Sequence, residues 1–418
     1  MINQIEHLNI LYNVTNFRSN SMFSFKKKLQ PNLKDCMSSK SGKDYRVIIK
    51  CKNFQDNITK KINSYKGEIL HSINTCGIIS ARLNTKAIER LLEYPEIEYI
   101  CFDEYLSLCG MSISTANKVK LSNKSNIMGK GVGIGIIDSG VYPHMDLITP
   151  SNKVGLFIDI IDGIIYPYDD NGHGTCTSGI IAGSGNRSNN MYCGVAPGST
   201  LYCYKAFDKF GKGFVSDILY ALELIILDSE KYNIKVICLP FELLYYNQFI
   251  ISCFDILFKT CTDKGIVPVV PSGSNRNIEG SLTGIALCKN CITVSGLDTT
   301  SSPKPYTYSS SGLMKNSSKP DLCAACVDIV SLNCNTAYIS QKNGLKLYPS
   351  KLEKSYTTFS GTSLAAAYIS GLCALLFENN PSLNFKDIVS LLKLSCEDLD
   401  IQRSSQGSGK VNLNKIIK

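Results

Sequence analysis

The chain has 418 residues and 44% apolar residues, enough for one large domain with a small companion and a sizeable buried core. Its net charge of +9 is spread along the sequence, which argues against a nucleic-acid footprint. The N-terminus lacks the pattern of a secretory signal, and no stretch is apolar enough to span a membrane. We therefore expect a cytoplasmic protein with 18 reduced cysteines and with neither nucleic acid nor membrane as a partner.

Residues 1–44 are polar and weakly patterned, and the sequence assigns them no role. Residues 45–108 differ, because apolar alternation and one amphipathic segment predict strands and helices in the order βαββαβ, which is typical of a small ferredoxin-like domain. The predicted strands are 45–52, 67–73, 79–83 and 97–103, and the predicted helices are 56–65 and 85–95. A looser linker at 109–127 follows.

From residue 128 to 418, short β-branched runs alternate with longer helical patterns. Such alternation predicts an α/β domain of three layers, α/β/α, with a parallel sheet between the helices. The predicted strands are 132–138, 201–207, 235–239, 266–270 and 291–296, and the predicted helices are 216–228, 249–261 and 362–377. Catalytic groups in such sheets gather at the carboxyl ends of the strands, where Asp138 lies.

Three short segments carry candidate catalytic residues. Asp138 follows an apolar strand in GIIDSGV, His173 opens a helix of small residues in NGHGT, and Ser363 begins another helix in FSGTSLAAA. Each segment alone could be a turn, a loop or a helix cap. Together they supply a nucleophile, a base that takes its proton and a carboxylate that orients the base, in the chain order of subtilisin.

These segments, with GVAPG and KPDLCAACVDIVS, resemble the landmark segments of the subtilisin-like protease family in the family's order. The similarity is greatest to the intracellular, long-prodomain enzymes of Gram-positive bacteria. It implies a subtilisin-like serine endopeptidase at 128–418, which cleaves polypeptides through an acyl-enzyme intermediate. Residues 45–108 resemble the family's inhibitory propeptide, which would make the chain's own small domain its intramolecular inhibitor.

The chain departs from the family's pattern at the residues that the resemblance assigns to the oxyanion. The family usually has Ala-Ala-Gly-Asn where this chain has Pro271-Ser272-Gly273-Ser274, so either Ser274 or the following Asn275 would donate to the oxyanion. Losing the family's donor slows subtilisin itself about 10² to 10³-fold without abolishing catalysis.

One edge of the substrate cleft keeps the small residues that let a peptide approach, Gly211-Lys212-Gly213. The other edge has Pro240-Phe241-Glu242 where the family usually has Ser-Leu-Gly. Glu242 could select a basic or a small side chain, or it could obstruct the cleft. An unpaired carboxylate there would favour Lys or Arg in the substrate.

These departures leave an alternative, a subtilisin-like pseudoprotease that acts as a binding or signalling protein. We expect no cofactor and assign no metal ligand: calcium is possible, but no segment matches the family's calcium loops. Two Cys-x-x-Cys pairs could hold zinc, but each adjoins a strand-like segment, which favours packing in the core. They are Cys288/Cys291 and Cys323/Cys326.

The segment that follows the small domain predicts maturation. No proline interrupts residues 104–114, so this tail can lie in the cleft as an extended strand. Leu106, Leu108 and Met111 are apolar and could fill pockets there. We expect one self-cleavage between Leu106 and Ser114, after which the released piece stays bound as an inhibitor.

Overall fold

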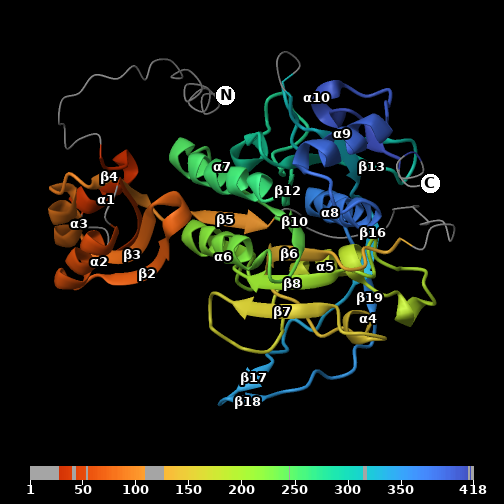
Figure 1. Cartoon of the computed structure of the whole chain (residues 1–418), viewed down its shortest axis with the longest axis horizontal. Helices are drawn as coiled ribbons and strands as arrows, with labels where there is room; N and C mark the ends of the chain where they lie inside the picture. Colours follow the sequence, from red (N-terminus) through yellow and green to blue (C-terminus); the bar gives the residue numbers. More distant parts are fainter. Residues whose placement is uncertain are drawn as a thin grey trace, which may run out of the picture.

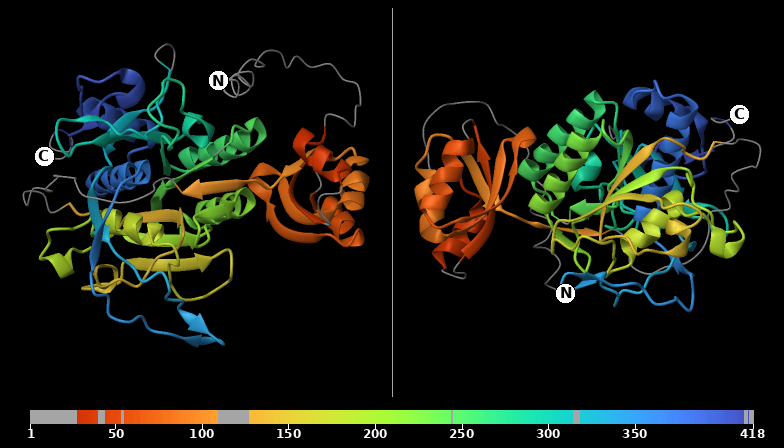
Figure 2. Two further views of the ribbon diagram at one scale, coloured as in Figure 1. Left: turned by 180° about the vertical axis from the view of Figure 1, so that it is seen from behind. Right: turned by 60° about the horizontal axis from the view of Figure 1, so that its bottom comes forward.

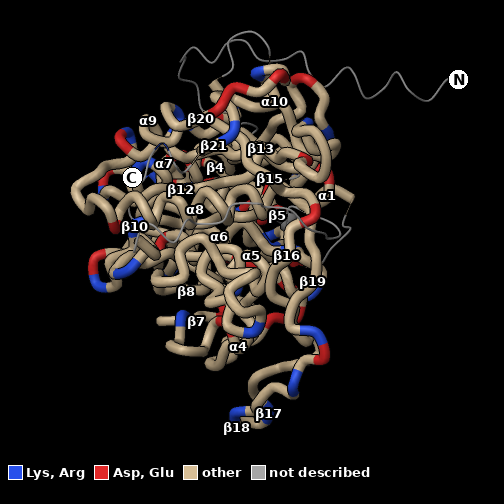
Figure 3. The backbone as a smooth tube through the Cα atoms, turned by 90° about the vertical axis from the view of Figure 1, so that its right-hand side faces the viewer, with Lys and Arg blue, Asp and Glu red and all other residues tan. Residues whose placement is uncertain are grey.

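The computed structural model describes residues 28–39, 44–52, 55–108, 127–243, 245–313, 318–412 and 415. Within these ranges, none of the helices is both long enough and apolar enough to cross a membrane. Acidic and basic residues are interspersed over the backbone rather than gathered by sign (Figure 3).

The small domain is a four-stranded antiparallel sheet with the strand order β2-β3-β1-β4, as a ferredoxin-like unit requires. Its strands are β1 (Asp44–Cys51), β2 (Glu68–Ile73), β3 (Ile78–Asn84) and β4 (Ile97–Phe102). Its helices are α1 (Pro31–Ser38), α2 (Gln55–Ser64) and α3 (Thr85–Leu92), with the 3-10 turn η2 (Asn74–Cys76). This confirms the predicted βαββαβ unit.

The small domain begins before the predicted boundary at residue 45. Leu29 bridges to Ile100 of β4, and the side chains of Leu33 and Met37 on α1 are buried in the core of this domain. The helix was missed because it is short and polar apart from these residues, so its periodicity is weak. The first 27 residues lie outside the described ranges.

The large domain contains a ten-stranded sheet in the order β20-β21-β15-β13-β12-β10-β6-β8-β7, with β14 added beside β13. The strands from β21 to β7 run parallel, as predicted. Their bounds are β6 (Gly133–Asp138), β7 (Val154–Asp159), β8 (Thr200–Lys205), β10 (Ile234–Cys238), β12 (Val267–Pro271), β13 (Ile292–Asp298), β14 (Lys304–Pro305), β15 (Leu322–Ala325), β20 (Cys396–Glu397) and β21 (Lys410–Val411).

Helices cover both faces of this sheet, which completes the predicted three layers (Figure 1). The core on one face contains α5 (His173–Ala182) and α8 (Thr362–Asn379), and the core on the other contains α6 (Val215–Asp228) and α7 (Gln248–Asp263). Parallel strands buried on both faces read as continuous apolar runs, which is why these strands were visible in the sequence.

The remaining elements connect or border the sheet. They are α4 (Met145–Ile148), η3 (Asn186–Ser188), η4 (Gly284–Leu287), β16 (Ile329–Leu332), β17 (Gln341–Lys342), β18 (Leu345–Lys346), β19 (Tyr356–Phe359), α9 (Phe385–Ser395) and α10 (Arg403–Gln406). The strands β16 and β19 form an antiparallel pair, as do β17 and β18.

A single strand, β5 (Tyr105–Leu108), leaves the small domain and enters the large one (Figures 1 and 2). It pairs antiparallel with both β9 (Lys212–Phe214) and β11 (Phe241–Leu243), forming a three-stranded sheet in which β5 is central. The tail of the small domain therefore lies in the large domain as an extended strand. Residues 109–126, which include most of the expected cleavage window, lie outside the described ranges.

Candidate active site

The structure brings Asp138 and His173 together. Asp138 is the last residue of β6, which lies between β10 and β8 in the large sheet, and His173 is the first residue of α5. The Nδ1 atom of His173 lies 2.8 Å from Oδ1 and 3.0 Å from Oδ2 of Asp138, whose residue is 1% exposed. A buried carboxylate on Nδ1 fixes the ring orientation and leaves Nε2 to act as the base.

Two further donors hold the Asp138 carboxylate in place. The backbone N–H of Ser139 donates to Oδ1 at 2.6 Å, and the hydroxyl of Thr177 donates to Oδ2 at 2.9 Å. Thr177 lies one helical turn beyond His173 on α5, so the helix that carries the imidazole also helps to orient its partner. Sequence analysis did not single out Thr177.

A second buried carboxylate, Asp169, organises the loop before His173 and was also missed. Its Oδ1 accepts from the Ser139 hydroxyl at 2.9 Å and from the N–H of Gly172 at 2.8 Å. Its Oδ2 accepts from the N–H and hydroxyl of Thr175 at 2.8 and 2.6 Å. Asp169 thereby ties the residues that flank His173 to the residue after Asp138. In the sequence, the pair of adjacent carboxylates at Asp169 and Asp170, just before the histidine segment, was the signal that could have indicated this role.

Lys205, the last residue of β8, is fully buried and also contacts the segments next to Asp138 and His173. Its Nζ donates to the carbonyls of Ser139 and Phe207 at 2.7 and 2.8 Å, and to Oδ1 of Asp170 at 2.6 Å. A buried ammonium needs such complete pairing to offset its desolvation. Lys205 therefore fixes the backbone that follows Asp138.

Close backbone approach explains one glycine of the histidine segment. A Cβ atom on Gly174 would lie 2.0 Å from the carbonyl oxygen of Gly140. Any side chain at this position would push the start of α5 away from the loop after β6. Gly174 therefore allows His173 to lie within hydrogen-bonding distance of Asp138.

Ser363 lies at the start of α8, and its side chain is buried. Its hydroxyl donates to the carbonyl of Pro240 at 3.1 Å, directly before β11. The neighbouring Thr362 donates to the carbonyl of Gly273 at 3.3 Å. The candidate nucleophile therefore borders both the strand that pairs with the tail and the loop after β12. Because Ser363 lies in the first turn of α8, the helix dipole stabilises negative charge that develops beside it.

The predicted substrate edges lie on the two sides of β5. Register pairs Leu106 with Gly213 and Ser107 with Lys212 on one side, and Ser107 with Glu242 and Leu108 with Phe241 on the other. Gly211, at φ +72°, forms the turn before β9. Both edges therefore pair with one extended chain, and Pro240 contributes its carbonyl rather than the donor that it lacks.

The two candidate oxyanion donors have different surroundings. Both the N–H and the hydroxyl of Ser274 donate to the carboxylate of Glu242, the N–H at 2.8 Å. The N–H of Asn275 donates to Ser310 at 2.9 Å, and its side-chain amide donates weakly to the 281–283 loop.

The Glu242 carboxylate therefore accepts two hydrogen bonds within the protein, which the sequence did not predict, and the expected preference for Lys or Arg stays a prediction. Sequence reasoning missed these contacts because β11 and the loop after β12 are separated along the chain and meet only in the fold.

The four cysteines of the Cys-x-x-Cys pairs are buried in the core. Burial raises the pKa of each thiol, which favours the protonated form that does not bind zinc. Within the described ranges, no group of three or more His, Cys, Asp or Glu side chains is placed to hold a metal ion.

Comparison with known proteins agrees with this geometry. The chain matches the subtilase family profile over residues 129–410. It is 30% identical to serine protease AprX of Bacillus subtilis (strain 168) over 364 residues, which cover 83% of this chain and 80% of that protein. It is 25% identical to M-protease of Shouchella clausii (strain KSM-K16) over 348 residues, which cover 82% of this chain and 80% of that protein.

Among solved structures, fervidolysin from Fervidobacterium pennivorans, a keratinolytic enzyme related to subtilisin, has a similar fold. The TM-score is 0.66 at 18% sequence identity, and the match covers 90% of this chain and 61% of that one. The profile match spans more than half of the chain, and the relatives are named as proteases. The chain therefore belongs to the subtilase family and is a subtilisin-like serine endopeptidase.

Proposed function

We propose that Ser363 attacks the substrate carbonyl, that His173 accepts the serine proton, and that Asp138 orients the imidazole and stabilises its protonated form. The reaction then passes through an acyl-enzyme, which water hydrolyses as His173 again acts as the base. The observation that carries this proposal is the contact of 2.8 Å between His173 and the buried carboxylate of Asp138. Ser363 lies beside the strand that holds the tail, where a substrate carbonyl would arrive.

We propose that Ser274 provides the side-chain donor of the oxyanion site, together with the N–H of Ser363 at the start of α8. Ser274 follows Gly273, whose carbonyl contacts Thr362 next to the nucleophile. The Ser274 hydroxyl donates to Glu242, so it must turn from that carboxylate to serve the oxyanion. This competition for the Ser274 hydroxyl would limit turnover.

Labelling with a fluorophosphonate probe tests the nucleophile directly. Matured wild-type protein should react once, and peptide mapping should place the adduct on Ser363. The Ser363→Ala variant should neither react nor hydrolyse a peptide substrate, while the Ser370→Ala variant, altered on the same helix, should react like wild type. Correctly folded wild-type protein that neither reacts nor cleaves peptides would favour a pseudoprotease.

We also propose that the small domain inhibits the enzyme until it is removed, and ion pairs across the interface support this. The guanidinium of Arg46 contacts Asp103 at 2.6 Å within the small domain and also contacts Asp217 on α6. His71 reaches the same Asp217 at 2.8 Å. Asp103 accepts from the N–H of Ser216 at 2.9 Å, so a carboxylate of the small domain caps the start of α6.

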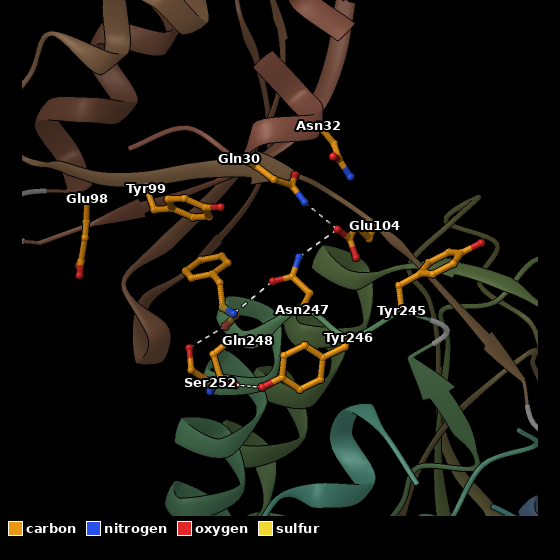
Figure 4. A pocket seen from close by; sticks show the side chains of 11 residues that line it. Gln30, Asn32, Glu98, Tyr99, Glu104, Tyr245, Tyr246, Asn247, Gln248 and Ser252 are labelled. Carbon is orange, nitrogen blue, oxygen red and sulfur yellow. Dashed lines mark hydrogen bonds between the residues drawn. The ribbon is translucent and has the colours of Figure 1, made fainter. Parts of the chain in front are cut away.

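A second group of contacts lies beside the tail, where residues of both domains line a cavity (Figure 4). The carboxylate of Glu104 accepts from Gln30 of the small domain at 3.0 Å and from Asn247 at the start of α7 at 2.9 Å. Away from this cavity, the hydroxyl and the N–H of Thr75 donate to Glu223 of α6 at 2.7 and 2.8 Å. These contacts set the small domain against α6 and α7, with its tail between the cleft edges.

We propose that self-cleavage in the window from Leu106 to Ser114 separates the two domains. Expressed protein should then appear as a fragment of about three-quarters of the chain with a new N-terminus in that window. The Ser363→Ala variant should stay at full length. Wild-type protein that is active and uncut would refute processing and leave the small domain as a regulator only.

We propose a cytoplasmic location for the enzyme. Many of its cysteines are core residues, such as Cys238 of β10 and Cys373 of α8, and these pack as small apolar groups against their neighbours. Cell fractionation that recovers the protein with secreted proteins would contradict this location.

A further inference from the structure

The direction of the tail shows how a substrate approaches the nucleophile. Because β5 and β11 are antiparallel, with Ser107 opposite Glu242 and Leu108 opposite Phe241, a chain bound like β5 runs toward Pro240. The carbonyl of Pro240 accepts a hydrogen bond from Ser363. On the proposed function, the bond to be cut therefore follows the substrate residue that lies opposite Pro240.

The side chain of that substrate residue lies on the same face as the side chain of Glu242. Directly opposed residues in an antiparallel pair project to the same face, and residues two apart on one strand share a face. Pro240 and Glu242 are two apart. A diagonal neighbour of this kind lies about 7–8 Å away between backbones, within reach of a long side chain. The substrate side chain and Glu242 therefore compete for one space.

Glu242 already bridges that space. Its residue is 7% exposed, and its carboxylate reaches from β11 to the loop after β12, where it binds both polar groups of Ser274. A Cβ atom on Gly273, at φ +99°, would lie 2.5 Å from Oε2 of Glu242. The carboxylate thus lies against the backbone of the loop, and the loop borders Ser363 through the contact between Thr362 and Gly273.

The charge of Glu242 is also poorly available to a basic substrate. Burial raises the pKa of this carboxyl, although the two hydrogen bonds from Ser274 oppose the shift. A lysine or arginine would meet a carboxylate whose two oxygens already accept hydrogen bonds from Ser274. Moving this side chain therefore costs two hydrogen bonds for any large substrate residue, whether it is charged or apolar.

We infer that Glu242 is a specificity-determining residue that narrows the pocket for the substrate residue before the cut, so that the enzyme selects Gly, Ala or Ser there. This inference rests on the proposed function, because it concerns the substrate of the same site. It replaces selection by charge with selection by size. A pocket of this kind discriminates against a larger side chain by steric exclusion rather than by a lost attraction.

The test compares peptides that differ only at the residue before the cut, with Ala, Phe or Lys there, cleaved by matured wild-type enzyme. We expect kcat/KM for Ala to exceed that for Phe and for Lys by about 10-fold or more, the lower range for filling a confined space. Glu242→Gly should lower the ratio of Ala to Phe by about 10-fold, because it empties the space. Glu242→Gln keeps the volume and removes the charge, so the ratio of Ala to Phe should persist.

Two results would overturn the inference. Wild-type enzyme that prefers Lys, with the preference lost in Glu242→Gln, would show that charge decides. A ratio of Ala to Phe near one in wild type would show that the pocket is open, whether or not either variant folds. Fluorophosphonate labelling separates these failures from failure of the proposed function: an enzyme labelled at Ser363 with the wrong profile refutes only the pocket, whereas an unlabelled, inactive enzyme refutes the catalytic assignment.

Discussion

Replacing Asp138 by Asn tests whether its charge serves catalysis or only the geometry of the loop. Asparagine has nearly the same shape as aspartate, and its side-chain amide can still form hydrogen bonds with the residues that contact the Asp138 carboxylate. Its oxygen can accept from the N–H of Ser139, and Thr177 can turn its own proton to the carbonyl of Gly174 at 3.0 Å. We therefore expect the Asp138→Asn protein to fold and to melt close to wild type.

The magnitude follows from the distance between the charges. The imidazolium formed during the reaction would have its charge centre about 4 Å from the carboxylate, which is worth about 4 kcal/mol at an effective dielectric constant of 20. Losing that interaction slows kcat about 10³-fold. If the amide N–H₂ turns toward His173 and selects the wrong tautomer, the loss approaches the roughly 10⁴-fold seen for the equivalent change in a protease of another fold.

Thr177→Val provides the matched comparison, because it removes one hydrogen bond from Asp138 while the charge and the side-chain volume stay. The hydrogen bond is made in the ground state as well as in the transition state, so kcat should fall by no more than about tenfold. The assay is kcat for a peptide substrate, with active enzyme counted by fluorophosphonate labelling. Asp138→Asn within tenfold of wild type, or Thr177→Val as slow as Asp138→Asn, would refute the catalytic role of the charge.

Three further predictions concern the surroundings of the site. Ser274→Asn should raise kcat if Ser274 occupies the oxyanion position, and an unchanged kcat with a large loss in Asn275→Ala would assign the donor to Asn275 instead. Arg46→Ala should shorten the delay before activity appears in timed peptide hydrolysis, because truncating a largely buried charge pair costs about 2–5 kcal/mol. Arg82→Ala breaks an exposed pair on the same domain, so this control should change the delay little. Lys205→Met should lower the melting temperature and kcat together by leaving its carboxylate partner unpaired, and a variant that melts like wild type would contradict the role of this buried ammonium.

The residues of the candidate site could be singled out from the sequence because they lie in short segments with strong local signals. Asp138 ends an apolar strand, and His173 and Ser363 each open a helix of small residues, so local pattern and chemistry coincided. The extended tail was also predictable, because an uninterrupted run without proline follows the last strand of the small domain. Its pairing with both β9 and β11 agrees with that expectation.

The contacts between distant segments could not be predicted in the same way. Glu242 and Ser274 meet because parallel strands place successive loops at one edge of the sheet, and nothing local in either segment indicates the pairing. Thr177 and Lys205 likewise read as ordinary helix and strand residues, and only the fold gives them a partner near Asp138. Sequence patterns indicate which residues have the required chemistry, whereas the fold decides which of them are already occupied by another contact.

Occupation of the cleft by β5 gives a physical reason for cutting the chain. On the proposed function, the tail would compete with substrates as an intramolecular ligand for as long as it is joined to the large domain. A substrate must also replace a strand that is hydrogen-bonded on both sides, to β9 and to β11. On the same proposal, cutting the connection would let the small domain dissociate, and dilution and degradation would then favour the open cleft. The contacts of Arg46 and Glu104 with the large domain would survive the cut, and they would set how slowly the released piece leaves.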